Sequence, residues 1–162
     1  MTVFHTIPPV FNADSKVLIL GSFPSVKSRE AAFYYGHPQN RFWRVLSGVL
    51  SAPLPTSTEE KKAMLLRHHI ALWDVIAACE INGSADSSIK NAQPNDLSLI
   101  FSAADIRAVF TNGKTADRLF DRYFQKSVSL PKVCLPSTSP ANARYSFDDL
   151  AAEWNAINTY IR

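Results

Sequence analysis

Short apolar runs alternate with longer segments of helical periodicity along most of this chain. Three runs, at 17–20, 106–111 and 133–135, are rich in β-branched and aliphatic residues and predict buried strands. A fourth run, 70–76, is ambiguous between a strand and another kind of buried segment. Strands that alternate with helices indicate a mostly parallel sheet covered on both faces. We therefore predict an α/β fold, a three-layer αβα sandwich around a central, mostly parallel, four-stranded sheet.

The segments between these runs carry the signals of helices. Ser57 and the acidic residues after it, for example, have the capping chemistry of a helix start. A polar stretch from Asn82 to Asn91 is typical of an exposed loop. No internal repeat and no long linker divides the sequence, so we expect one domain over residues 1–162. The predicted helices are 42–50, 57–68, 94–100, 114–124 and 147–160.

Composition excludes several classes of protein. A chain of 162 residues, 46% of them hydrophobic, can bury a full core and is not disordered. No apolar run approaches the roughly 20 residues of a spanning helix, and the first residues lack the pattern of a secretory signal. We therefore expect a cytoplasmic protein without membrane contacts. The net charge of +3 favours an anionic partner only mildly, because the charges are spread along the chain.

Metal and cofactor motifs are not evident. Cys79 and Cys134 are isolated from one another, and the adjacent His68 and His69 point in different directions on a helix. The segment 112–115 (Asn-Gly-Lys-Thr) lacks the earlier glycine of a phosphate-binding loop, although it suits a helix start that contacts a phosphate. We expect no metal and no cofactor.

Three loops follow the carboxyl ends of predicted strands, at 21–41, 111–115 and 136–145. Such loops converge on one cleft in an open parallel sheet. The first is aromatic, the second begins a helix, and the third holds hydroxyl groups, prolines and an arginine. Aromatic rings stack on bases, hydroxyls and helix N-termini hold phosphates, and an arginine can fill a vacated site in a duplex. This combination favours a flipped nucleotide over a small metabolite.

The order of motifs in these loops resembles the uracil-DNA glycosylase superfamily. The motifs are Gly-Ser-Phe-Pro-Ser at 21–25, Tyr-Gly-His-Pro-Gln-Asn-Arg-Phe-Trp at 35–43 and Leu-Pro-Ser-Thr-Ser-Pro-Ala-Asn at 135–142. Within the superfamily the chain is most similar to the hypoxanthine (deoxyinosine) DNA glycosylases, near the mismatch-specific uracil/thymine enzymes. The resemblance runs from about Val17 to the last helix.

Two departures from the superfamily bear on the substrate. Its members usually carry Asp or Asn two residues after the glycine of the first loop, where it positions or activates water. Here that residue is Phe23, preceded by Ser22, and neither is a base. The third loop also lacks the histidine that many uracil-cleaving members use. The resemblance then leaves Asn40, on which the deoxyinosine branch relies, as the catalytic residue, and it favours hypoxanthine over uracil.

The resemblance also implies roles for other loop residues. Tyr35 matches the aromatic residue that stacks on the base, with Tyr34 or Phe33 as alternatives, and Asn40 by itself would also suit a helix cap. Arg144 is our choice for the residue that enters the duplex, with Tyr145 as its rival. The expected base pocket is formed by Gly21, Ser22, Phe23, Pro24, Ser25, Tyr35 and His37. The expected DNA contacts are Lys114, Thr115, Ser137, Thr138, Ser139, Asn142, Arg144 and Tyr145.

The resemblance implies a monofunctional enzyme that acts on DNA containing a deaminated base. It hydrolyses the bond between base and sugar and leaves an abasic site. We expect it to work as a monomer. Asn40 can align a water or hold the base, but it cannot remove a proton at neutral pH. Hypoxanthine differs from adenine at O6 and N1–H, and backbone groups of the 21–25 loop could read that difference. Three alternatives stay open: a uracil/thymine glycosylase, a reader of damaged bases without catalysis, and a nucleotide-binding domain.

Overall fold

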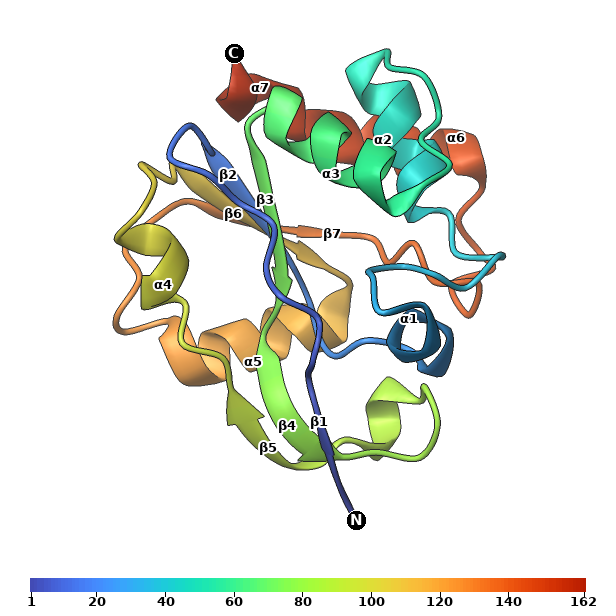
Figure 1. Cartoon of the computed structure of the whole chain (residues 1–162), viewed down its shortest axis with the longest axis vertical. Helices are drawn as coiled ribbons and strands as arrows, with labels where there is room; N and C mark the ends of the chain where they lie inside the picture. The colour runs from blue at the N-terminus through green and yellow to red at the C-terminus, as the bar shows by residue number, and fades with distance from the viewer.

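Two sheets joined through neighbouring strands organise the computed structural model, which describes all 162 residues (Figure 1). The central sheet has four parallel strands in the order β3-β2-β6-β7. A smaller antiparallel sheet, in the order β1-β4-β5, continues from the carboxyl end of β3. The strands are β1 (Thr2–Phe4), β2 (Val17–Gly21), β3 (Ile70–Asp74), β4 (Ile76–Glu80), β5 (Lys90–Pro94), β6 (Ala108–Asn112) and β7 (Lys132–Leu135).

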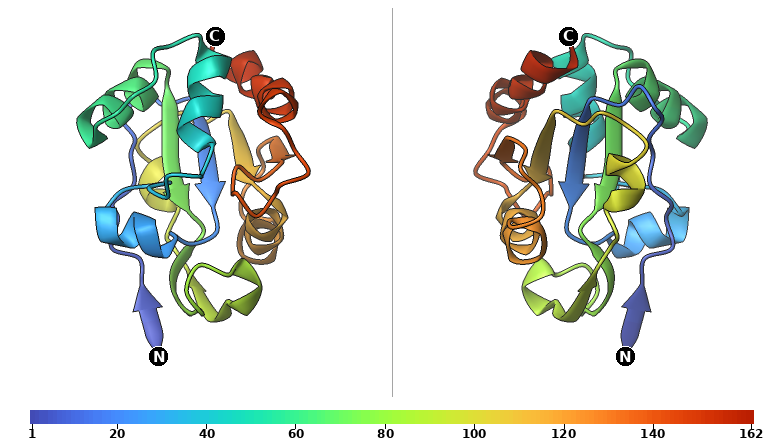
Figure 2. Two further views of the ribbon diagram at one scale, coloured as in Figure 1. Left: turned by 90° about the vertical axis from the view of Figure 1, so that its right-hand side faces the viewer. Right: turned by 90° about the vertical axis from the view of Figure 1, so that its left-hand side faces the viewer.

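Helices cover both faces of the central sheet, which confirms the predicted three-layer αβα sandwich (Figures 1 and 2). On one face lie α2 (Phe42–Leu50), α3 (Thr58–Arg67), α6 (Phe147–Trp154) and α7 (Asn158–Ile161). On the other lie α4 (Ser98–Phe101) and α5 (Lys114–Phe124), while α1 (Val26–Ala31) lies near the carboxyl ends of the strands. Short 3₁₀ turns occur at Asp86–Ser88 and Asn155–Ile157. No helix has the length and apolar character to cross a bilayer.

The core follows from the continuous apolar strands. Every residue of β2 and β3 is buried, as expected for central strands covered on both faces. The apolar side chains of both strands belong to one cluster of 35 buried hydrophobic residues, which also includes the buried faces of α2 and α6. The ambiguous segment 70–76 is therefore a strand that ends at Asp74, with β4 starting two residues later.

Three local predictions were wrong. The stretch 82–91 is not simply a loop, because it contains the 3₁₀ turn and the first residues of β5. The helix expected from Pro94 begins instead at Ser98, since residues 90–94 pair with β4. The first loop contains α1, a six-residue helix whose N-cap is Ser25. Both β5 and α1 are short and mostly polar, so neither leaves a hydrophobic period in the sequence.

Gly21, the last residue of β2, leaves room for the side chain of Asp74 in β3. Its register partner in β3 is Asp74. A Cβ at position 21 would lie 2.4 Å from Asp74 Oδ1 and 3.0 Å from Tyr35 Oη. Glycine is therefore required here by space, because any larger residue would displace the carboxylate.

Gly21→Ala is expected to lower the free energy of unfolding by about 1–3 kcal/mol, since the added methyl group overpacks a buried site. Urea denaturation monitored by circular dichroism measures this. Gly48→Ala is the control: it lies within α2, a Cβ there would meet Phe147 at an ordinary 3.4 Å, and helix propensity predicts a gain of about 0.5–1 kcal/mol. Equal stability changes in the two variants would contradict the close approach.

Candidate active site

A cavity of about 360 Å³ opens at the carboxyl ends of β2, β3 and β6, where three loops meet. The structure places every residue of the expected base pocket in its wall, together with Asn40, Ser137, Thr138 and Ser139. Its wall also holds residues outside the expected base pocket and DNA contacts: Ser28, Asp74, Ser84, Asp86, Asn112, Pro140 and Ala141. Tyr34, weighed as an alternative to Tyr35, lines it too.

Residues at the start of α2 hold the aromatic part of the first loop in place. Trp43 donates its indole N–H to the carbonyl of Tyr34 at 3.1 Å. The ring of Tyr35 stacks on Phe42, with the centroids 4.0 Å apart and the planes at 17°. Tyr35 adopts a φ of 53°, a left-handed conformation that is rare for a bulky residue and clusters at functional sites. One face of the Tyr35 ring is therefore covered, which leaves its other face or its edge for a ligand.

Asn40 belongs to a hydrogen-bond network that joins all three loops. Its Oδ1 accepts from the backbone N–H of Phe42 and from the hydroxyl of Thr138, each at 2.9 Å. Thr138 in turn accepts from Asn112 Nδ2 and donates its own N–H to Asn112 Oδ1, each at 3.1 Å. Thr138 is completely buried, so water does not compete for these bonds.

The network fixes which end of the Asn40 carboxamide faces the cavity. A backbone N–H can only donate, so the atom beside Phe42 N must be the carbonyl oxygen. The Thr138 hydroxyl accepts from the Asn112 amide, so its own proton is donated to the same Asn40 oxygen. Asn40 thus caps the start of α2 with its oxygen and keeps its Nδ2 amide without a protein partner. Its available group is a donor, and its carbonyl is not free to align a water.

His37 supplies a second donor by the same logic. The N–H of Gln39 donates to His37 Nδ1 at 3.1 Å, which requires that nitrogen to be unprotonated. The proton of the neutral ring then lies on Nε2, and Nε2 makes no hydrogen bond within the protein. His37 therefore orders its loop through one nitrogen and can donate from the other.

Arg41 holds the third loop in place, a role that the sequence did not reveal. Its guanidinium donates to the backbone carbonyls of Ser139, Asn142 and Tyr145. Trp154, at the end of α6, donates to the Pro136 carbonyl at 2.9 Å. These carbonyl contacts carry no sequence signal, because any residue offers the same backbone acceptor.

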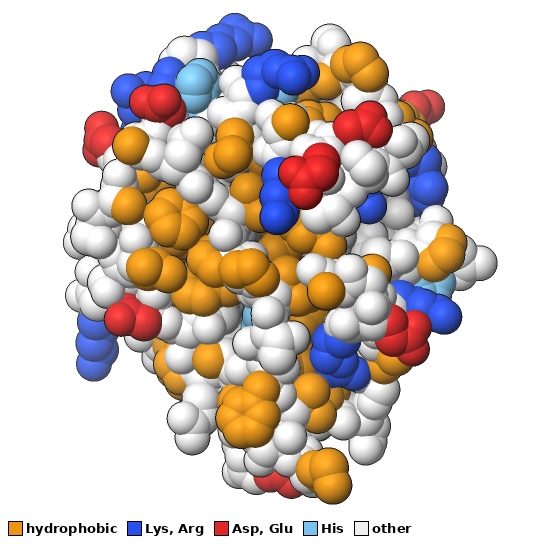
Figure 3. Space-filling model, in the orientation of Figure 1, with side chains coloured by type: hydrophobic (Ala, Val, Ile, Leu, Met, Phe, Trp, Pro, Cys, Tyr) orange, Lys and Arg blue, Asp and Glu red, His pale blue; other side chains and the backbone are white.

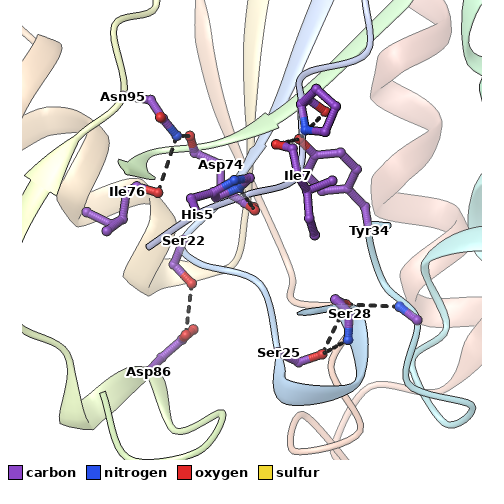
Figure 4. Close-up of polar contacts among 12 residues, drawn as sticks. His5, Ile7, Ser22, Ser25, Ser28, Tyr34, Asp74, Ile76, Asp86 and Asn95 are labelled. Carbon is purple, nitrogen blue, oxygen red and sulfur yellow. Dashed lines mark hydrogen bonds and ion pairs between the residues drawn. The ribbon is translucent and has the colours of Figure 1, made fainter. Parts of the chain in front are cut away.

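Two carboxylates also reach the cavity (Figure 4). Asp74, at the end of β3, accepts from His5 Nε2 through Oδ2 at 2.8 Å, and both side chains are almost fully buried. Asp86 accepts from the Ser22 hydroxyl at 2.8 Å. Although Asp86 as a residue is exposed, desolvation of its carboxylate raises its pKa, and the charge of Asp74 adds to this. The site therefore holds acidic groups despite Phe23 in the first loop.

The remaining predicted DNA contacts lie outside the cavity wall. Lys114 and Thr115 begin α5, and Thr115 receives a long bond of 3.4 Å from Arg118. In the third loop Asn142 donates to the Ser137 carbonyl, whereas Arg144 is exposed and makes no ion pair. On the face drawn in Figure 3, basic side chains are scattered and do not form one patch.

Comparison with known proteins identifies the architecture around this site. The family model of the uracil DNA glycosylase superfamily matches residues 8–161. The chain belongs to this superfamily. Within the superfamily, a hypoxanthine DNA glycosylase of Methanosarcina acetivorans is 36% identical over 152 residues, 93% of this chain and 94% of that protein. One from Methanosarcina barkeri is 37% identical over 139 residues, 85% of this chain and 87% of that protein.

A solved structure of another superfamily candidate has the same fold. It is the solution NMR structure of a proposed uracil DNA glycosylase from Methanosarcina acetivorans, with a TM-score of 0.80 and 30% sequence identity. The likeness covers 98% of this chain and 99% of the other. The uracil-DNA-glycosylase-like α/β fold and the resemblance inferred from the loop motifs are thus confirmed.

Thr138→Val, a near-isosteric change in this uracil DNA glycosylase superfamily member, tests the network. It is expected to lower the free energy of unfolding by about 1–3 kcal/mol, because the half-buried Asn112 amide loses its acceptor. Urea denaturation measures the change. Thr138→Ser is the control and retains most of the stability, since the hydroxyl remains; equal losses in both variants would show that the methyl group, and not the hydroxyl, matters.

Proposed function

We propose that this member of the uracil DNA glycosylase superfamily removes hypoxanthine from DNA by hydrolysis and leaves an abasic site. The observation that carries the proposal is the fixed orientation of Asn40, which presents an N–H donor in a cavity sized for a base. The two relatives named hypoxanthine DNA glycosylases support the choice of base. The base is flipped out of the duplex to reach the cavity.

Asn40 acts on the leaving group. Breaking the N-glycosidic bond puts negative charge on the departing base and positive charge on the sugar. A preorganised donor aimed at the developing negative charge lowers the barrier without reorganisation. The Nδ2 of Asn40 is such a donor, held by Thr138 and Phe42, and His37 Nε2 offers a second. The carboxylate of Asp86 and the DNA phosphates stabilise the positive sugar.

The reaction is hydrolytic because the cavity offers no amine nucleophile. A lyase needs a lysine to form a Schiff base with the sugar, and no lysine lines the cavity. Water therefore adds to the sugar once the bond to the base has loosened. The product keeps an intact phosphate backbone, which alkali then breaks.

In this proposal, the DNA backbone is bound by the second and third loops. Hydroxyls at 137–139 and the start of α5, with Lys114 and Thr115, suit phosphate contacts. Arg144 fills the space that the flipped nucleotide leaves. Its exposure, its freedom from ion pairs and the Arg41 contacts that hold its loop support this role. The enzyme works as a monomer in this scheme, since one chain supplies the whole cavity.

Asn40→Ala tests the proposal in a single-turnover assay. Labelled duplexes with one deoxyinosine, one deoxyuridine or one mispaired thymidine are incubated with the protein, treated with alkali and resolved on a gel. The wild type is expected to cleave the deoxyinosine strand, and only after alkali. Asn40→Ala is expected to slow that cleavage by roughly 10²–10³-fold, the usual effect of losing one preorganised donor.

Asn155→Ala is the matched control, because this asparagine is exposed on the helical layer and does not line the cavity. It should cleave at the wild-type rate. Cleavage chiefly at uracil or thymine would reassign the enzyme to the uracil/thymine branch. Binding of the inosine duplex without cleavage would replace the enzyme by a reader of damaged bases.

A further inference from the structure

Asp74 presents an unused carboxylate oxygen to the cavity. The residue is 3% exposed, and its Oδ2 is taken by His5 at 2.8 Å. No hydrogen bond within the protein reaches Oδ1, and Asp74 is part of the cavity wall. Figure 4 shows the His5 contact that engages its other oxygen. The proposed reaction on Asn40 and the sugar makes no use of this group. Oδ1 is open to the cavity, so a base that enters and desolvates this carboxylate must supply a donor for it.

The carboxylate is also rigidly held. His5 fixes its rotation from one side, and His5 itself is 1% exposed. Asn95 donates to the backbone carbonyls of both Asp74 and Ile76, at 2.9 and 3.2 Å, which pins the end of β3. Gly21, opposite in register, leaves the space into which Oδ1 points. Such preorganisation suits the reading of a ligand edge.

Two backbone carbonyls of the first loop are already engaged. The 21–25 loop was expected to offer backbone groups that distinguish hypoxanthine from adenine. The carbonyl of Gly21, however, accepts from Val75 N at 2.8 Å, and that of Ser22 accepts from Ile76 N at 3.1 Å. The neighbouring phenols stay neutral, because burial and then the charge of Asp74 raise the pKa values of Tyr34 and Tyr35. Asp74 Oδ1 is thus a charged acceptor of the cavity wall that has no donor within the protein.

We infer that Asp74 is the specificity residue that accepts N1–H of hypoxanthine through Oδ1, an inference that rests on the proposed function. Hypoxanthine carries a donor at N1, whereas adenine carries a lone pair there. A carboxylate attracts the first and repels the second, so normal adenine is rejected by the same atom that binds the damaged base. Asp74 therefore sets which base is cut, while Asn40 helps to cut it.

The test compares two bases that differ at this edge. Single-turnover rates are measured on duplexes with one deoxyinosine or one purine deoxynucleoside, whose base lacks both O6 and N1–H. In Asp74→Asn, His5 keeps the side-chain oxygen and the new amide N–H faces N1, which opposes hypoxanthine and suits purine. The ratio of the hypoxanthine rate to the purine rate is expected to fall about tenfold or more.

Asp86→Asn is the control for charge, because it also removes a carboxylate from the cavity wall but lies apart from the buried floor. Its ratio should stay at the wild-type value, whatever its absolute rates. If Asp74→Asn slowed both bases equally, Asp74 would act on water or on the sugar, and the inference would be overturned.

A second measurement needs no variant and stands even if Asp74→Asn does not fold. The wild type should excise purine about tenfold more slowly than hypoxanthine or worse, although purine is the smaller base and enters without a clash. Equal rates would overturn the role of Asp74 and leave the proposed function intact. Absence of excision at deoxyinosine by the wild type would instead overturn the proposed function itself.

Discussion

The hydrogen bond from the Thr138 hydroxyl to Asn40 Oδ1 is the contact on which the site depends. It joins the first and third loops, and through Asn112 it reaches the end of β6 as well. A carboxamide can both accept and donate hydrogen bonds. Because Thr138 and the Phe42 N–H occupy the Asn40 oxygen, only the amide of Asn40 remains available, as a donor. Asn40 thus caps the helix with its oxygen and keeps its amide available for a ligand, because the two ends of the side chain have different partners.

The acidic groups of the cavity do not belong to the three loops that the sequence connects with the site. The first loop carries Phe23 where the superfamily usually has Asp or Asn, yet Asp74 and Asp86 enter from β3 and from the turn before β5. Asp74 is buried and tied to His5, so it is suited to hold a fixed edge of a base. Asp86 is more exposed and sits beside Ser22, where negative charge favours a positive sugar. In the proposed scheme, Asp74 recognises the base and Asp86 stabilises the charge on the sugar.

Much of the molecule could be predicted from local patterns. The run 17–20 is apolar without interruption because β2 is covered on both faces, and the motif after it places the first loop at the cavity. The place of Asp74 in the cavity could not be predicted, since it follows from the parallel register with Gly21, which is distant in the chain. Arg41 acts through backbone carbonyls and β5 pairs through polar residues, so neither produces a motif or a hydrophobic period.

The most direct measurement is a crystal structure of the wild type with a duplex that contains one 2′-fluoro-2′-deoxyinosine. The fluorine disfavours positive charge on the sugar, so the bond survives and the bound base can be seen. Hypoxanthine is predicted to lie in the cavity with N1 within hydrogen-bond distance of Asp74 Oδ1, and with Asn40 Nδ2 donating to an acceptor of the base. A base left stacked in the duplex, or an Asn40 amide that donates only to protein or sugar atoms, would contradict this arrangement.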